Sequence, residues 1–381
     1  MSPDSGAEAA RDASSDLTHH PATVRAAVKT GVERTELRIF PWPSIGEAEG
    51  VLRVEAVGVG GAEPEIYRGE KWNPIIMGHQ VVGTIVEMGP LARTLWNVEL
   101  GERVVIQEYL PCKACEWCLR GEYRFCPKSD FFAEPAPRRF GLMDFTDPPH
   151  LVGGFAEYMA LPWNTVIHRI PQTLSPHLAT LAIPLGNGVQ WATFDVNAGP
   201  GKTVLVIGPG QQGLGAVIAA KQAGASKVIL AGLGRDRTRL ELAPKLGADH
   251  VIFADEVDLL DGVRAVAKGV DVVVDTTGDP GGENMRRYLE LANQGAYLWV
   301  NCMDTGVPVR DIKRKYLTVR SGRGRTHAAV ERALQIINSG IYPLEQMCTH
   351  VFGLDEVDLA IKATAGKGVQ GAIHVIVEPW R

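Results

Sequence analysis

The stretch that decides the fold is Lys202-Thr-Val-Leu-Val-Ile-Gly208-Pro-Gly210-Gln-Gln-Gly213. It places a Gly-x-Gly-x-x-Gly pattern directly after an apolar run and at the start of a helical segment expected over 211–223. Glycines at this spacing allow a tight turn and let a pyrophosphate approach backbone N–H groups at the helix start. We therefore expect a dinucleotide site that includes Gly208, Gly210, Gln211, Gln212 and Gly213.

From about residue 188 onward, short apolar runs alternate with helical segments. Strands are expected at 203–207, 227–231, 251–253, 270–275 and 296–301, and helices at 211–223 and 238–246. Alternation of strands and helices at this spacing predicts a parallel, doubly wound α/β sheet. The nucleotide-binding domain is predicted to span 188–319.

The chain before this region has a different texture. Between 24 and 171, apolar runs are short and are split by Gly and Pro, which predicts strands at 51–57, 80–86 and 102–106 in a β-rich domain. After 319 a helix is expected at 328–338, with strands at 349–352 and 373–378, and this segment is expected to return to the first domain. Residues 1–23 are rich in Ser, Asp, Ala and Thr and read as a flexible tail.

Composition narrows the class of protein. The chain has 381 residues, 45% of them hydrophobic and 22% charged, which suits an ordinary protein of two domains. No apolar run reaches the roughly 18 residues of a membrane span, and a net charge of -5 offers no basic footprint for nucleic acid. We expect a cytoplasmic protein that acts on a small molecule and binds neither nucleic acid nor membrane.

Four of the six cysteines are crowded together as Cys112-x2-Cys115-x2-Cys118-x7-Cys126. Such a cluster argues for a metal in a reducing compartment. Four thiolates around Zn²⁺ form a closed tetrahedral site that stabilises structure and leaves no position open for chemistry. One structural zinc per chain is the prediction, and iron–sulfur ligation is the alternative.

The end of the second strand bears on the choice between NADP and NAD. An acidic residue there normally binds the adenosine ribose 2′-hydroxyl, but this chain has Gly232, followed by Arg235 and Arg237. Loss of the carboxylate makes room for a 2′-phosphate, and a guanidinium can pair with it. The sequence therefore favours NADP. In the alternative, Asp236 serves an NAD ribose.

Three motifs together carry a family resemblance: Gly78-His79-Gln80-Val-Val-Gly83-x-Ile-Val-Glu-x-Gly89, the cysteine cluster at 112–126, and the glycine pattern at 208–213. In this order they resemble the zinc-containing medium-chain dehydrogenase/reductase family, which includes alcohol, polyol and threonine dehydrogenases. The resemblance runs from about Val24 to Pro379. It implies a GroES-like catalytic domain (24–187 plus 320–381, with the zinc lobe at 112–126) that is interrupted by a Rossmann domain (188–319). It also implies homodimers or homotetramers.

The departures from the family pattern concern the catalytic zinc. Members with this zinc usually have Gly-x-Cys-Gly-Ser/Thr-Asp-x-His, where this chain reads Gly58-Val-Gly60-Gly-Ala62-Glu63-Pro-Glu65. Gly60 stands at the thiolate position and Ala62 at the hydroxyl of the proton relay. The family's His ligand is retained as His79, but the segment 182–188, where a third ligand is expected, has no Cys or Glu. One imidazole cannot hold a catalytic zinc, since such sites use three protein ligands and water.

The sequence thus predicts an NADP(H)-dependent reductase that delivers hydride to a polarised C=C, C=N or C=O without catalytic zinc. The candidate proton donors are His79, Glu65 and Tyr67. Asn301 and Cys302, at the end of a late strand, are further candidate donors that face the nicotinamide region. The resemblance places His374 near the pyrophosphate. Two alternatives stay open: an alcohol or polyol dehydrogenase in which Glu63 or Glu65 joins His79 in a remodelled zinc site, and a non-catalytic cofactor-binding protein.

Overall fold

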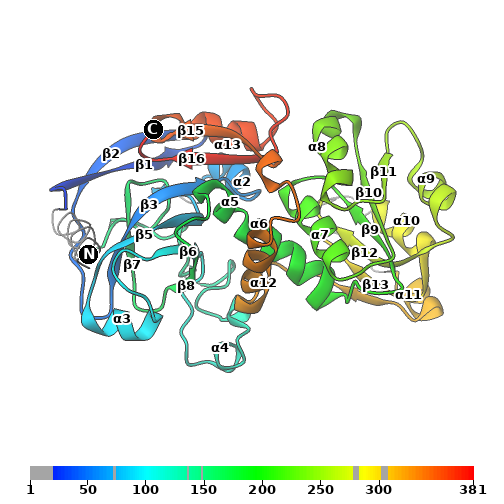
Figure 1. The fold of residues 1–381 in the computed structure, drawn as a ribbon, viewed down its shortest axis with the longest axis horizontal. Helices are drawn as coiled ribbons and strands as arrows, with labels where there is room; N and C mark the ends of the chain where they lie inside the picture. The colour runs from blue at the N-terminus through cyan, green and yellow to red at the C-terminus, as the bar shows by residue number, and fades with distance from the viewer. Residues whose placement is uncertain (1–19, 72–73, 135–136, 147–148, 278–282, 302–307) are drawn as a thin grey trace, which may run out of the picture. The chain divides into compact units, whose positions relative to one another are not determined.

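The computed structural model describes residues 20–71, 74–134, 137–146, 149–277, 283–301 and 308–381 (Figure 1). The chain divides into two compact units. Unit 1 comprises Met1–Thr180, Val351–Gly368 and Val375–Arg381, and unit 2 comprises Leu181–His350 and Val369–His374. Within the described ranges, no helix combines the length and the apolar character that crossing a membrane requires.

Unit 1 is built mainly of antiparallel strands. One sheet has the order β2-β1-β4, and a second follows the path β15-β16-β3-β5-β6-β8, with β7 also paired to β3. The strands are β1 (Thr23–Gly31), β2 (Arg34–Pro41), β3 (Gly50–Gly58), β4 (Ile75–Ile76), β5 (Gln80–Met88), β6 (Arg103–Gln107), β7 (Tyr158–Leu161), β8 (Val166–Arg169), β15 (Cys348–Gly353) and β16 (His374–Glu378).

Short helices connect these strands. They are α2 (Glu63–Arg68), α3 (Pro90–Trp96), α4 (Glu116–Leu119), α5 (Pro176–Thr180) and α13 (Val357–Thr364). Pro64 and Pro90 stand in the first turn of α2 and α3, where a missing N–H costs no helical hydrogen bond. The helices are short because glycine and proline interrupt the sequence, as the absence of long helical periodicity predicted.

The strand pair β3 and β5 forms the centre of unit 1. Most of its apolar side chains are buried, and Gly58 is registered opposite Gln80. At Gly83 a Cβ would lie 2.2 Å from the Arg53 carbonyl oxygen, so only glycine permits the close approach of the two backbones. This pairing fixes the backbone that immediately precedes β5, where His79 stands.

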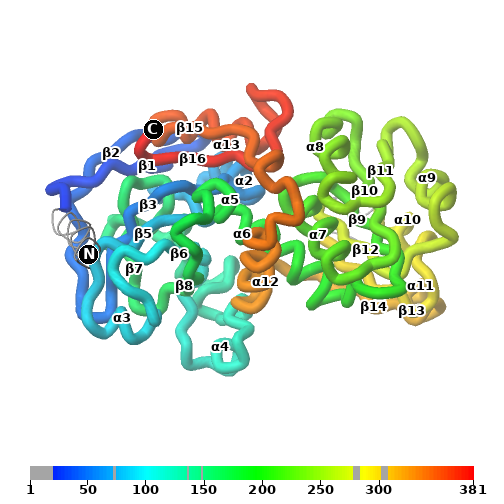
Figure 2. Tube along the Cα trace, viewed as in Figure 1, coloured from blue at the N-terminus to red at the C-terminus, as the bar shows by residue number. Residues whose placement is uncertain are grey.

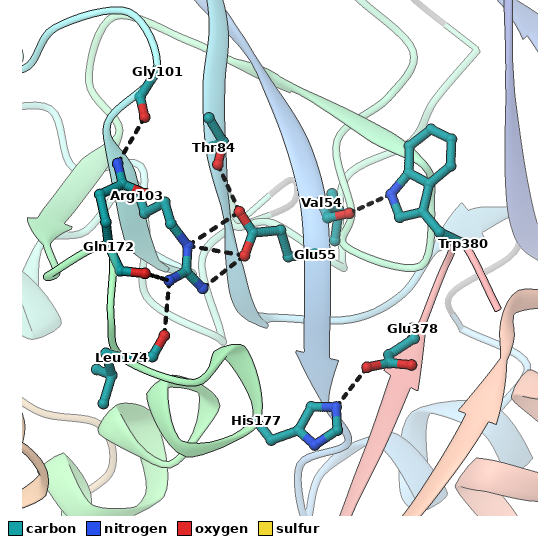
Figure 3. Close-up of polar contacts among 10 residues, drawn as sticks. All are labelled: Val54, Glu55, Thr84, Gly101, Arg103, Gln172, Leu174, His177, Glu378 and Trp380. Carbon is teal, nitrogen blue, oxygen red and sulfur yellow. Dashed lines mark hydrogen bonds and ion pairs between the residues drawn. The ribbon is translucent and has the colours of Figure 1, made fainter. Parts of the chain in front are cut away.

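A half-buried ion pair ties the sheet to the loop before α5 (Figure 3). The Arg103 guanidinium lies 2.7 Å from the Glu55 carboxylate, which also accepts a hydrogen bond from Thr84 Oγ1. The same guanidinium donates to the backbone carbonyls of Gln172 and Leu174. Because the guanidinium meets several acceptors, the charge is well compensated despite its burial.

The end of the chain returns to unit 1, as the sequence predicted. Ile376 and Val377 of β16 pair with Gly58 and Val57 of β3, and the red C-terminal segment in Figure 2 runs beside the blue strands. Trp380 anchors this end, since its indole N–H donates to the Val54 carbonyl at 2.7 Å (Figure 3).

Unit 2 contains a six-stranded parallel sheet in the order β11-β10-β9-β12-β13-β14, the arrangement of a dinucleotide-binding fold. Its strands are β9 (Thr203–Ile207), β10 (Lys227–Gly232), β11 (His250–Phe253), β12 (Val270–Asp275), β13 (Ala292–Trp299) and β14 (Thr318–Arg320). Its helices are α6 (Ala182–Gly188), the π-helical segment Val189–Asp195, α7 (Gln211–Gln222), α8 (Arg237–Leu242), α9 (Leu259–Val266), α10 (Glu283–Leu291), α11 (Val309–Lys315) and α12 (His327–Asn338).

Both faces of this sheet are covered. Leu205 and Ile229 pack with α9 and α10, while their neighbours Val204 and Val228, which point to the other face, are equally buried. The predicted strands 203–207 and 270–275 match β9 and β12. The helix expected over 238–246 ends as an α-helix at Leu242 and continues as a 3₁₀ turn over Ala243–Leu246, because Pro244 lacks the N–H that an α-helix needs.

The compact units differ from the domain boundaries predicted from the pattern of apolar runs, glycines and prolines in the sequence. Residues 320–350, predicted to belong with the first domain, lie in unit 2. Contacts with a distant part of the chain explain this placement: the Thr326 hydroxyl donates to the Gln190 side chain at 2.8 Å, and the Trp191 indole donates to the Gly324 carbonyl at 3.1 Å. Most of the predicted N-terminal tail lies outside the described residues, and β1 begins at Thr23.

Candidate active site and metal centre

The cysteine lobe brings its four thiols together. The Sγ atoms of Cys112, Cys115, Cys118 and Cys126 all lie within 4.8 Å of one another, with 3.5 Å between Cys115 and Cys118 and 4.0 Å between Cys112 and Cys118. Four thiolates at Zn–S distances of about 2.3 Å stand roughly 3.8 Å apart at the corners of a tetrahedron. The geometry therefore fits a closed four-sulfur ion site.

The backbone of the lobe favours a thiolate. The backbone N–H groups of Ala114 and Cys115 point at the Cys112 sulfur and lower the pKa of that thiol to about 6, although burial opposes the shift. Burial raises the pKa of Cys118 instead. Without a cation the Cys118 thiol therefore keeps its proton, whereas a Zn²⁺ ion bound to it would displace that proton.

His79 and Glu63 form the second polar pair of unit 1. Glu63 Oε1 lies 2.6 Å from His79 Nδ1, and the side chain of Glu63 is only 1% exposed. Apart from this contact, neither carboxylate oxygen has a hydrogen-bond partner among the described residues. A buried carboxylate requires a polar partner, and the His79 ring supplies one.

The loop before β5 fixes the position of His79. Gly78 has φ +90°, and a Cβ there would lie 2.9 Å from the backbone nitrogen of Phe155. Backbone hydrogen bonds from Gly154 to Gly78 and from Phe155 to Met77 hold this turn. His79 is thus held on a well-defined backbone, and its Nδ1 atom contacts the Glu63 carboxylate. Nε2 is the ring nitrogen that does not make this contact.

Gly60 leaves the room that this pair occupies. A Cβ at position 60 would lie 2.7 Å from His79 Cε1, 2.8 Å from His79 Nε2 and 2.7 Å from Glu63 Oε2. Real Cβ atoms do not approach other atoms so closely. The imidazole and the carboxylate therefore fill the volume in which the family's zinc-binding thiolate begins.

A catalytic zinc would need three protein ligands near His79. His79 belongs to no group of three His, Cys, Asp or Glu side chains within ligand distance, as judged over the ranges the structure describes. The segment expected to hold a third ligand forms α6, where the Asn187 amide oxygen accepts a hydrogen bond from the buried Arg325 guanidinium at 2.9 Å.

The other two predicted proton donors lie on α2 and differ in their surroundings. Glu65 is exposed. Tyr67 is buried, its hydroxyl donates to the Glu33 carbonyl at 2.6 Å, and burial raises the pKa of the phenol. The structure thus brings together His79 and Glu63, whereas Tyr67 is engaged with the backbone. The catalytic assignments of His79, Glu65 and Tyr67 stay predictions.

In unit 2 the glycine pattern forms the turn between β9 and α7. Gly208 has φ +93°, and a Cβ at Gly213 would lie 1.8 Å from the Gly208 carbonyl oxygen, so the turn needs both glycines. At Gly210, by contrast, a Cβ would meet nothing within 4 Å. The open space at Gly210 and the first N–H groups of α7, which include that of Gln212, suit a pyrophosphate.

Two buried side chains brace this helix start. His374 Nδ1 lies 2.6 Å from Gln211 Oε1, and the His374 backbone N–H donates to the Met347 carbonyl. The structure thus brings both predicted cofactor residues to the start of α7. Asn301 follows β13 and is half-buried. Cys302, another predicted donor near the nicotinamide, lies outside the described residues.

The loop after β10 holds the predicted ribose residues. Gly232 is buried, with no space for a side chain beside Pro209. The Arg235 side chain is 79% exposed, whereas Arg237 lies 2.8 Å from the Glu256 carboxylate and over the Phe253 ring. Asp236 lies 3.0 Å from Arg239. Sequence reasoning missed Asp255, which accepts a hydrogen bond from the Gly234 N–H, because it follows a different strand.

Comparison with protein families agrees with this architecture. Residues 46–172 match the "Alcohol dehydrogenase GroES-like domain" and residues 213–339 match the "Zinc-binding dehydrogenase" family. The chain is 35% identical over 374 residues to the "Probable alcohol dehydrogenase adh" of Mycobacterium tuberculosis, which covers 94% of this chain and 99% of the relative. It is 29% identical to the "Erythritol/L-threitol dehydrogenase" of Mycolicibacterium smegmatis, over 91% of this chain and 95% of the relative.

Solved structures share the fold. A zinc-binding dehydrogenase of Sinorhizobium meliloti bound to NADP superposes with a TM-score of 0.80 at 25% identity, over 94% of this chain and 100% of the other. An alcohol dehydrogenase of Thermotoga maritima gives 0.81 at 22% identity, over 94% and 100%. The fold and the relatives define the class: a GroES-like and Rossmann oxidoreductase. The chain belongs to the zinc-containing medium-chain dehydrogenase/reductase family, which confirms the resemblance and the enzyme class predicted from its motifs.

Proposed function

We propose that this enzyme is an NADP(H)-dependent reductase that delivers hydride to a polarised C=C, C=N or C=O of a small molecule, with no zinc in catalysis. The observation that carries the proposal is the glycine at position 60. The His79 and Glu63 side chains occupy the space next to it, where a metal-binding thiolate would have to start. A site with one imidazole and no thiolate lacks the three protein ligands of a catalytic zinc.

The pair His79 and Glu63 supplies the acid. The carboxylate holds a proton on Nδ1 and orients the ring, so that Nε2 can carry the proton given to the substrate. A bound nicotinamide supplies the hydride. A neutral C=C, C=N or C=O bond gains that hydride at carbon and the proton from His79 at the other end, and solvent reprotonates the ring. An iminium ion needs only the hydride.

The cofactor assignment rests on the loops of unit 2. Gly208, Gly210 and the start of α7 are suited to the pyrophosphate, and the exposed Arg235 near the end of β10 favours a 2′-phosphate. The Sinorhizobium meliloti relative, at 25% identity, is bound to NADP. We further assign one structural Zn²⁺ to the four cysteines of the lobe.

Two measurements test the reductase proposal. Metal analysis of the purified protein should find one zinc per chain, and NADPH should be oxidised with at least one member of a panel of enals, enones, cyclic iminium ions and ketones. Glu63→Gln should lower kcat by about 10- to 100-fold, because a neutral amide orients the His79 ring less firmly than a carboxylate does. Glu63→Asp serves as the charge-preserving control. Unchanged kcat in Glu63→Gln would remove the pair from the mechanism.

A second candidate is an alcohol or polyol dehydrogenase with a remodelled catalytic zinc. The buried Glu63 carboxylate beside His79 favours it, as do relatives named alcohol and erythritol/threitol dehydrogenases. Two zinc ions per chain, with alcohol oxidation that a chelator abolishes while the fold persists, would establish this alternative.

We also propose that the enzyme works in the cytoplasm as a homodimer or homotetramer, as its family membership suggests. Light scattering of the purified protein tests the oligomer: a mass of one chain would exclude it.

A further inference from the structure

The loop that follows β10 is where a fold of this type reads the 2′ position of the adenosine ribose. The end of the strand itself cannot carry the usual acid in this chain. A Cβ at Gly232 would lie 2.8 Å from both Cγ and Cδ of Pro209, the residue between the first two glycines of the phosphate loop. Any carboxylate that faces the ribose must therefore come from another segment.

Asp255 supplies such a carboxylate. It follows β11, the strand next to β10, and its two oxygens lie 2.8 and 2.9 Å from the Gly234 backbone nitrogen. A Cβ at Gly234 would lie 3.1 Å from Asp255 Oδ2, so the glycine keeps this contact close. Asp255 is exposed, so its charge faces the solvent from which a cofactor arrives.

The neighbouring cations are engaged to different degrees. Arg237 pairs with Glu256, and Arg239 pairs with Asp236 and donates to the Ala372 carbonyl. Arg235 reaches furthest into solvent, with a side chain that is 79% exposed and a guanidinium 3.8 Å from Asp236. A 2′-phosphate bound at this loop would thus be near the extended Arg235 guanidinium and the Asp255 carboxylate. The carboxylate already accepts the Gly234 N–H, so that donor is not free for the phosphate.

We propose that Asp255 is a specificity-determining residue: its carboxylate takes the Gly234 N–H and repels a 2′-phosphate, which restrains the preference for NADP that Gly232 and Arg235 create. The inference rests on the proposed nicotinamide-cofactor function. It predicts that the protein accepts both NADP and NAD, and that removal of this one charge moves the balance toward NADP.

The size of the effect follows from Coulomb's law. A repulsion between two unit charges of the same sign about 4 Å apart in water weakens the binding of the phosphate by about fivefold. The second negative charge of a phosphate increases this factor to roughly thirtyfold. The expected change in the preference for a 2′-phosphate therefore lies between about 5- and 30-fold at low salt, where screening is weak.

The test uses Asp255→Asn, which keeps an acceptor for the Gly234 N–H and removes only the charge. The matched control is Glu290→Gln, which removes an exposed carboxylate at the last turn of α10, paired with Arg264. Calorimetry gives Kd for 2′,5′-ADP and for 5′-AMP, and the fluorescence of bound NADPH and NADH provides a second pair of values. Neither readout needs the substrate.

The ratio of Kd for 5′-AMP to Kd for 2′,5′-ADP should rise by about 5- to 30-fold in Asp255→Asn and stay unchanged in Glu290→Gln. If the native protein binds these nucleotides and Asp255→Asn leaves the ratio unchanged or lowers it, the inference is wrong while the proposed cofactor function stands. If the native protein binds none of the four ligands, both fail.

Discussion

Replacement of Gly60 by alanine gives the sharpest test of how the His79 and Glu63 pair is seated. The added methyl would stand 2.7 to 2.8 Å from His79 Cε1, His79 Nε2 and Glu63 Oε2. Ordinary van der Waals contact begins near 3.4 Å. The imidazole and the carboxylate must therefore move by about 0.6–0.7 Å, because both cannot keep their places around the methyl group.

Two consequences follow from this displacement. Overpacking in a site of this kind costs about 1–3 kcal/mol of the free energy of unfolding. A catalytic group misplaced by about 1 Å loses on the order of 100-fold in rate, so kcat/KM for NADPH-dependent reduction should fall by 10- to 100-fold. The backbone at Gly60 lies outside the left-handed region, so the methyl contact itself is the cause.

Urea unfolding measures the stability change, and NADPH oxidation with the best substrate of the carbonyl and iminium panel measures the rate. Gly61→Ala is the matched control, because a Cβ at Gly61 meets nothing within 4 Å. That variant should keep native stability and activity. A Gly60→Ala protein that is as stable and as active as Gly61→Ala would refute the placement of the imidazole and carboxylate against Gly60.

Three further predictions concern other residues. Tyr67→Phe should keep kcat within about twofold and lose about 1 kcal/mol in urea unfolding, since it removes the hydroxyl's hydrogen bond to Glu33 and its interaction with Asp358. A 100-fold loss in kcat would support Tyr67 as a proton donor. Cys126→Ser should reduce the zinc content below one per chain, measured by plasma emission spectroscopy, and lower the free energy of unfolding by several kcal/mol, measured by urea denaturation. A variant that keeps its full zinc content and stability would argue against a four-cysteine site. Burial raises the pKa of Cys348 to about 12, so this thiol stays protonated at pH 8 and should resist iodoacetamide in the native protein. Mass spectrometry would detect the labelling, which should increase only as the pH rises toward that pKa. Rapid labelling at pH 8 would show instead that Cys348 is accessible as a thiolate.

Local sequence determined much of the fold. The strands at 203–207 and 270–275 and the helix that begins at Gln211 occur where predicted, because alternation of apolar runs with helical segments and the glycine turn between them are properties of neighbouring residues. The helix α9 was not predicted, although Asp258 accepts hydrogen bonds from the N–H groups of Leu260 and Asp261 and caps its start. That aspartate was the available signal.

Domain membership depended on contacts that no local pattern contains. Residues 320–350 were expected with the first domain because their texture resembles it. The hydrogen bonds of Thr326 and Gly324 to Gln190 and Trp191 place them in unit 2 instead. Such bonds join residues more than 130 positions apart.

The sequence by itself determined the family, the cysteine cluster, the glycine turn and the glycine at position 60, since each depends on which residue types stand at short, fixed spacings. Tertiary structure decided that Glu63 contacts the His79 ring, that Tyr67 is bonded to the backbone of Glu33, and that Asp255 reaches the Gly234 N–H. The physical reason is that hydrogen bonds and charges act over a few ångströms in space. Which side chains come within that distance is settled by the packing of segments that lie apart in the chain.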